Sequence, residues 1–248
     1  MELMIDLHRH NPRQGPGSDA DTLRALNMIA LPKKPLEIID IGCGSGSQTL
    51  CLAKNTRAHI TAVDLFPEFL EELKERSDQA GLADNISVSR QSMDKLDFRK
   101  DSIDLIWSEG AIYNMGFENG IKEWRNFLKP GGYLAVSEVT WTNNHRPAEI
   151  EAFWHSEYPE IDTASAKIKI LEQYGYTLSG YFIIPPGSWL SNYYQPLEEG
   201  FASFLQRHNY SATAKRLVQE HRDEIALYQK FKEYYSYGFY IARKDEAF

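Results

Sequence analysis

From residue 36 onward, short apolar runs alternate with amphipathic segments. This alternation constrains the fold more than any other feature of the sequence. Such alternation is typical of βαβ units, in which helices join the parallel strands of a doubly wound sheet. We therefore expect an α/β fold with a seven-stranded sheet. The expected strands are LEIIDIG from residue 36, HITAVD from 59, NISVSR from 85, SIDLIWSEG from 102, YLAVSEVT from 133, YTLSGYFIIP from 176 and YYSYGFYIARK from 234.

The segments between the runs carry helix signals. SQTLCLAKN follows the first strand, and FPEFLEELKERSDQAGL has Pro67 in its opening turn and Gly81 where a helix commonly ends. TASAKIKILEQYG, which precedes the sixth strand, is also expected to be helical. GFENGIKEWRNFLK is expected to form one helix that the following PGG ends, because its large apolar side chains fall on one helix face. These side chains are Phe117, Ile121, Trp124 and Leu128.

Three segments do not follow this alternation of strands and helices. Residues 1–35 precede the sheet and contain RQGPGS, which predicts either a lid over a bound ligand or a disordered leader. Within the remaining domain, 36–248, the stretches 141–162 and 190–233 are insertions, and the second is far longer than a usual connection. We expect the two insertions to form a cap over the substrate.

Composition excludes several classes of protein. Lys and Arg total 27 against 35 Asp and Glu, and the formal net charge of −8 disfavours a nucleic-acid partner. No apolar run approaches the roughly 20 residues of a membrane span. No secretory signal is visible, so a cytoplasmic protein is expected. The two cysteines, Cys43 and Cys51, match neither a disulfide framework nor a metal-binding pattern, and we expect passive thiols and no metal site.

The first strand leads into the glycine-rich sequence DIGCGSGSQ. A triphosphate-binding loop needs a lysine after its last glycine, where Ser47 and Gln48 stand here. The dinucleotide fingerprint needs its third glycine where Ser47 stands, and the acid Asp40 at the strand tip disfavours a pyrophosphate. A carboxylate there favours a cationic amino group, and the glycines allow a close approach of the backbone. The loop therefore suits a zwitterionic, positively charged nucleoside.

Acidic residues follow the other expected strands as well. Asp64, Asp94 and Glu109 end or follow the second, third and fourth strands. Because ligands of open α/β sheets bind at the carboxyl edge, we expect these residues and Asp40 to converge on one crevice. A carboxylate at the position of Asp64 can accept hydrogen bonds from both hydroxyls of a ribose.

The ordered set IDIGCGSG, VDLF, QSMD, IDLIWSEGAIYNM and LKPGGYLAVSEVTW resembles the class I S-adenosylmethionine-dependent methyltransferases that act on small molecules. The resemblance covers about residues 36–140. It implies a Rossmann-like fold with an antiparallel last strand, and S-adenosylmethionine as cofactor with S-adenosylhomocysteine as product. It also implies that the glycine loop carries the methionine part, Asp64 the ribose and Asp94 the adenine. Further expected cofactor contacts are Gly42, Gly44, Gly46, Leu65, Ser92, Met93 and Glu109, with Arg13 of the lid near the cofactor carboxylate.

Methyl transfer is an in-line displacement that depends mainly on alignment. Four residues at or beyond the strand ends are candidate bases for an amine or hydroxyl acceptor. They are Glu109, Tyr113, Glu138 and His155. The alternative for Glu109 is a surface or capping role, and the alternative for His155 is no chemical role. The aromatic residues of two segments that flank the carboxyl edge, in and next to the insertions, either line an acceptor pocket or simply pack. They are Trp141, Trp154, Trp189, Tyr193 and Tyr194.

The expected protein is thus an enzyme that methylates a small-molecule acceptor at an unspecified N, O or C atom. No nucleic-acid or membrane partner is expected, and a homodimer is the candidate assembly. Two alternatives stay open. One is a partner or scaffold protein that binds the cofactor without catalysis, and the other is an NAD(P)-dependent oxidoreductase.

Overall fold

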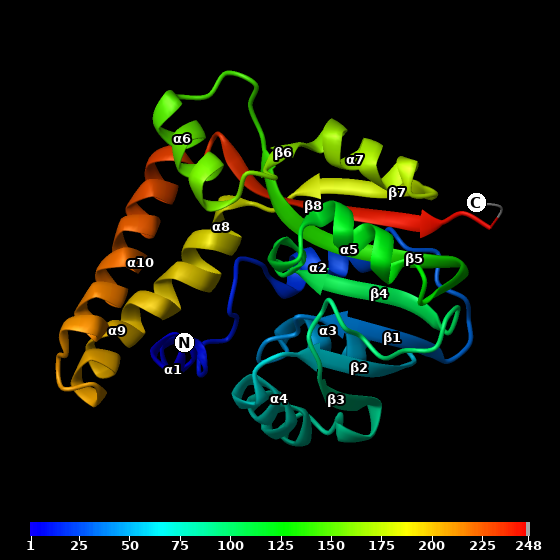
Figure 1. Cartoon of the computed structure of the whole chain (residues 1–248). Coiled ribbons are helices and arrows are strands. Elements are labelled where there is room, and N and C mark those ends of the chain that lie inside the picture. The colour runs from blue at the N-terminus through cyan, green and yellow to red at the C-terminus, as the bar shows by residue number, and fades with distance from the viewer. Residues whose placement is uncertain (247–248) are drawn as a thin grey trace.

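The computed structural model describes residues 1–246, and a mixed sheet forms its centre. Seven strands follow the order β3-β2-β1-β4-β5-β8-β7, and the two-residue β6 pairs with the end of β5 (Figure 1). β8 runs antiparallel to both of its neighbours, whereas β1 to β5 are parallel. The strands are β1 (Leu36–Ile41), β2 (Ala58–Asp64), β3 (Ile86–Arg90), β4 (Ile103–Glu109), β5 (Leu128–Trp141), β6 (Asp162–Thr163), β7 (Tyr176–Ile183) and β8 (Tyr235–Lys244).

This topology confirms the predicted doubly wound α/β fold with an antiparallel last strand. The seven expected strands are all present. The eighth, β6, was not predicted, because a two-residue strand carries no hydrophobic periodicity.

Helices cover both faces of the sheet. The side chains of Leu36 and Ile38 belong to the core shared with α2, α3 and α4, and those of Ile39 and Ile41 belong to the core shared with α5 and α7. Side chains alternate along a strand, so β1 contributes to both cores. These helices are α2 (Asp19–Leu26), α3 (Ser47–Asn55), α4 (Pro67–Gln79), α5 (Phe117–Trp124) and α7 (Ala164–Gln173).

A second group of helices lies beyond the carboxyl ends of the parallel strands (Figure 1). The long α9 and α10 run side by side, and α1 packs against α9. The group comprises α1 (Glu2–His8), α6 (Ala148–Glu157), α8 (Pro186–Trp189), the π-helical turn η3 (Leu190–Tyr194), α9 (Gln195–Arg207) and α10 (Ala212–Phe231). Short 3-10 turns, η1 (Ala83–Asn85) and η2 (Ile112–Asn114), complete the chain. No helix within residues 1–246 is both long and apolar enough to span a membrane.

The structure corrects the predicted helix over GFENGIKEWRNFLK. Phe117, Ile121 and Trp124 are buried on one face of α5, as expected, but α5 ends at Trp124. Leu128 begins β5, where it pairs with Ile103 of β4. The sequence PGG therefore does not end a helix. It lies within β5, between Leu128 and Tyr133, where the pairing with β4 shifts in register. Pairing with β4 outweighs the local helical pattern of residues 125–129.

Candidate functional site

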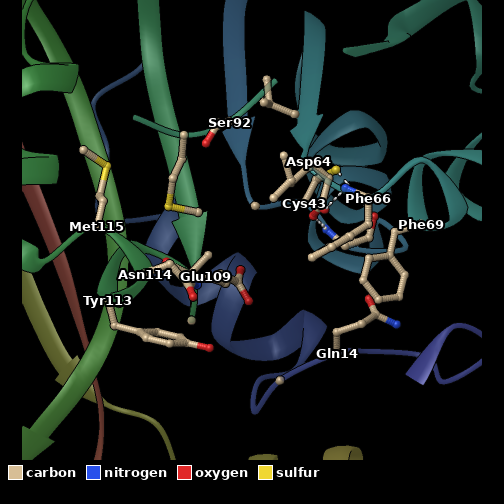
Figure 2. A pocket seen from close by; sticks show the side chains of 18 of the residues that line it. Gln14, Cys43, Asp64, Phe66, Phe69, Ser92, Glu109, Tyr113, Asn114 and Met115 are labelled. Carbon is tan, nitrogen blue, oxygen red and sulfur yellow. Dashed lines mark hydrogen bonds between the residues drawn. The ribbon is translucent and has the colours of Figure 1, made fainter. Parts of the chain in front are cut away.

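A cavity of about 870 Å³ opens at the carboxyl edge of the sheet (Figure 2). Its walls come from the turns after β1, β2, β3 and β4 and from the N-terminal segment. In Figure 2, Gln14 and Phe69 lie on one side of the cavity and Tyr113 and Met115 on the other. The predicted residues that line it are Arg13, Gly42, Gly44, Asp64, Leu65, Ser92, Met93, Asp94, Glu109 and Tyr113.

Two glycines of the loop are required by their surroundings. Gly42 and Gly44 have φ angles of +72° and +54°, which side chains other than hydrogen disfavour. A Cβ on Gly42 would overlap Ala111, and one on Gly44 would overlap the Gln14 amide oxygen. Both glycines line the cavity, so backbone is exposed there to a ligand. Gly46 does not line it, because it caps the start of α3 and packs against Leu73.

Asp64 ends β2 at the cavity. Its carboxylate accepts hydrogen bonds from the backbone N–H of Gly44 at 2.9 Å and of Phe66 at 3.0 Å. Burial raises the pKa of Asp64, and these N–H donors partly oppose the rise. A carboxylate has about four acceptor positions, so Asp64 retains capacity for ligand hydroxyls.

The turn after β3 forms another wall. Ser92 donates a hydrogen bond to the exposed carboxylate of Asp94, and this bond lowers the pKa of Asp94. The indole of Trp124 donates to the Met93 carbonyl at 3.0 Å and so ties the turn to α5. All three residues of the predicted SMD sequence therefore face the same cavity as Asp64.

Asp40 lies beneath the glycine loop and does not line the cavity. Its side chain is fully buried and accepts hydrogen bonds from Thr49 at 2.5 Å and from Gln48 at 3.4 Å. Burial, reinforced by the charges of Glu109 and Asp64, raises the pKa of Asp40 to about 7. Asp40 shares the β1 face of Ile38, which α3 covers. The direct contact with a ligand amino group that the sequence suggested is not available in this geometry.

Glu109, at the tip of β4, is held by three donors. Trp107 Nε1 and Thr22 Oγ1 donate to Oε1 at 2.9 and 2.6 Å, and an Arg13 nitrogen donates to Oε2 at 3.0 Å. The second terminal nitrogen of Arg13 donates to Asp19 at 2.8 Å. Arg13 and Glu109 are both nearly buried, with 8% and 5% of their side chains exposed.

The other candidate bases separate into two groups. Tyr113 lines the cavity with 44% of its surface exposed, and its ring meets Tyr158 edge-on. Glu138 does not line the cavity. It is fully buried 3.6 Å from the Lys167 ammonium, and burial raises its pKa to about 7 while Lys167 opposes the rise. His155 also lies away from the cavity, exposed on α6 with Nδ1 2.7 Å from the Glu151 carbonyl oxygen.

The aromatic residues of the insertions pack instead of lining the cavity. Trp189 stacks on Tyr228 with ring centroids 4.5 Å apart, and Trp154 meets Tyr235 at 5.0 Å. Cys43 faces the cavity, and burial raises the pKa of its thiol well above the usual value. Neither it nor Cys51 forms a disulfide.

Gln14 is a site residue that the sequence analysis missed. Its amide oxygen accepts from the Ser45 N–H at 2.7 Å, and its amide nitrogen donates to the carbonyls of His8 and Asn11 at 3.1 and 3.2 Å. Gln14 thereby lies directly on the glycine loop. Its place within RQGPGS was the available signal, but no periodicity indicates which side chain of an irregular segment turns inward.

A family model described as a methyltransferase domain matches residues 38–132. The methyltransferase GfsG of Streptomyces halstedii is 30% identical over 104 residues, which are 42% of this chain and 37% of that protein. The chain thus spans little more than a third of this curated relative.

Solved structures share the fold over nearly the whole chain. YjhP from E. coli has a TM-score of 0.85 at 17% identity, covering 98% of this chain and 99% of that one. A methyltransferase from Geobacter sulfurreducens, crystallised with S-adenosylhomocysteine, has a TM-score of 0.80 at 18% identity, covering 97% and 95%. Residues 38–132 thus match a methyltransferase domain, and the chain as a whole shares the fold of solved S-adenosylmethionine-dependent methyltransferases, in agreement with the resemblance seen in the sequence.

Proposed function

We propose that this chain transfers a methyl group from S-adenosylmethionine to a small-molecule acceptor in the 870 Å³ cavity. The observation that carries the proposal is the order of residues around one cavity. Gly42 and Gly44 offer backbone to the methionine part, Asp64 offers a carboxylate to the ribose, and Asp94 offers an acceptor to the adenine amino group. The cavity volume is near the upper end of the range for ligand pockets, which suits a cofactor together with an acceptor.

The proposed reaction is an in-line displacement. An acceptor atom forms a bond to the methyl carbon as the sulfur–methyl bond breaks, and the electron pair of that bond stays on sulfur. The protein's contribution is to align acceptor, methyl group and sulfur, and to exclude water. The acceptor lies on the side of Tyr113 and Met115, across the cavity from Gln14 and Phe69 (Figure 2).

Tyr113 is the candidate that meets the acceptor, since its ring is half exposed within the cavity. The N-terminal region 1–35 acts as the lid. The insertions 141–162 and 190–233 act as a cap whose packed aromatic residues support that side of the site.

Calorimetric titration with S-adenosylmethionine, S-adenosylhomocysteine and NADH tests the proposal. The first two ligands should bind and NADH should not. Asp64→Ala should weaken binding roughly 10- to 100-fold, because a hydrogen bond to a charged group contributes about 1.5–3 kcal/mol. Asp84→Ala, at an exposed aspartate of η1, is the matched control and should bind as the wild type does.

Preferential binding of NADH would favour the oxidoreductase alternative. Binding of S-adenosylmethionine without transfer of its labelled methyl group to any member of an acceptor library would favour the non-catalytic alternative. Absence of binding by both adenosyl ligands would contradict the proposal itself.

A further inference from the structure

We propose that Glu109 is a positioning residue that holds the N-terminal segment 13–17 over the cavity, so that its ion pair with Arg13 controls how fast the cofactor enters and leaves. This inference rests on the proposed function, because it takes the cavity to be the cofactor site.

The surroundings of Glu109 leave little room for a role as base. Three donors occupy its two oxygens, at 2.6 to 3.0 Å, and a carboxylate has about four acceptor positions. To take a proton from an acceptor, Glu109 would have to release Arg13, Thr22 or Trp107. Trp107 belongs to β4 itself, whereas Arg13 and Thr22 come from the N-terminal region. Glu109 therefore connects the tip of a central strand to residues that precede the sheet.

Segment 13–17 is held from two sides. On one side is Glu109, and a Cβ added to Gly17 would lie only 3.1 Å from its Oε2, which shows how closely the segment approaches. On the other side are α8 and η3, where the Gly17 N–H donates to the Ser188 carbonyl at 3.2 Å and the Asn192 amide donates to the Gly17 carbonyl at 3.1 Å. The contact with Glu109 is charged and buried, and those with α8 and η3 are neutral.

The same segment covers the glycine loop. Gln14 follows Arg13 directly and accepts the Ser45 N–H, so a displacement of Arg13 should also move Gln14 from the loop. Residues 13–16 all line the cavity. A ligand that contacts them should be exchanged more readily when they move, as in other enzymes with mobile lids. Separating the two partners of a buried ion pair leaves each buried charge uncompensated. The pair between Arg13 and Glu109 therefore opposes movement of segment 13–17 away from the cavity.

Stopped-flow measurement of S-adenosylhomocysteine binding tests the inference. Glu109→Gln and Arg13→Lys should each raise both the association and the dissociation rate, by roughly 10-fold or more, as expected when a buried charge pair is broken. Lysine keeps the charge of Arg13 but cannot bridge Glu109 and Asp19 with a planar pair of nitrogens. The double variant should match the faster single variant, because the two residues act as one unit.

Asp6→Asn is the matched control, since it breaks an exposed ion pair between the N-terminal helix and Arg207 and should leave both rates unchanged. Rates equal to those of the wild type in folded Glu109→Gln or Arg13→Lys would overturn the inference, and so would a faster dissociation with an unchanged association. If the wild type itself failed to bind S-adenosylhomocysteine, the proposed function would fail first, which keeps the two failures distinguishable.

Discussion

Asp40 and Asp64 end neighbouring parallel strands, yet their side chains are in opposite situations. Asp64 reaches the cavity and keeps free acceptor positions, whereas Asp40 turns under the loop toward the first turn of α3. The difference follows from the alternation of side chains along β1, which directs Asp40 to the same face as Ile38. An acid at a strand tip is therefore a ligand contact only where its face opens to the cavity.

Asp40→Asn should test this assignment through stability and binding together. The pKa of Asp40 rises from 3.8 to about 7 on folding, so the folded state favours the neutral form. The free energy of unfolding should accordingly decrease by on the order of a few kcal/mol as the pH rises from about 4 to 7. Above pH 7 it should stay at this lower value. Asparagine cannot ionise and still accepts from Thr49, so the variant should be more stable than the wild type at pH 8.

Urea denaturation at pH 5 and pH 8 measures the effect, and S-adenosylhomocysteine affinity should change less than about twofold, since Asp40 does not line the cavity. A loss of affinity above 10-fold would restore Asp40 as a direct ligand.

Among the elements, α1 joins the lid to the cap. His8 Nε2 lies 3.1 Å from His221 Nε2 of α10, and His221 Nδ1 donates to the Leu217 carbonyl at 2.9 Å. Burial first, and the neighbouring His221 second, lower the pKa of His8 to about 4. The His8 ring is therefore neutral in this contact.

Acidification should weaken this contact. Folding lowers the pKa of His8, so the neutral ring stabilises the folded state fully above about pH 6.5. As the pH falls from 6.5 to 4 this contribution is lost, and the free energy of unfolding decreases by about 3 kcal/mol. His8→Phe should flatten this part of the pH profile of chemical denaturation. His155→Gln, at an exposed histidine of α6, should leave the profile unchanged. An identical slope for His8→Phe and the wild type between pH 4 and 6.5 would contradict the role assigned to His8.

Element boundaries also show where sequence reasoning fails. The pattern of Phe117, Ile121 and Trp124 correctly located α5, because a helix buries one continuous face. Leu128 continued the pattern by spacing alone, and its burial in β5 instead depends on pairing with a strand 25 positions earlier, at Ile103. Local periodicity contains no information about such a partner.

In the whole molecule, the sequence predicted the alternating α/β plan, and most of the residues that it assigned to the cofactor line the cavity. Gly42, Gly44, Asp64 and Asp94 follow strands directly, and parallel strands bring their carboxyl ends to one edge. Glu138 was misplaced because the covering helix α7, which brings Lys167 against it, cannot be inferred from the pattern of β5. Gln14 was missed because its position depends on how an irregular segment closes over the loop. Strand tips are predictable from sequence, and the closure around them is not.

The cavity joins parts of the chain that are otherwise separate, so ligand binding should stabilise the molecule as a unit. A ligand at 100 times its dissociation constant adds about 2.7 kcal/mol to the free energy of unfolding. For a chain of this size, each kcal/mol raises Tm by about 2–4 °C, so S-adenosylhomocysteine should raise Tm by roughly 5–10 °C.

Hydrogen exchange should locate this stabilisation. S-adenosylhomocysteine should protect the amides of residues 13–17 and 42–46 as well as those of 92–94, because all three segments surround the cavity. 5′-Methylthioadenosine, which lacks the amino-acid part, is the matched ligand and should protect 92–94 with little effect on 13–17. Equal protection of 13–17 by both ligands would show that the segment closes on the nucleoside. Protection confined to 92–94 with S-adenosylhomocysteine would show that the lid and the glycine loop do not take part in holding the methionine end.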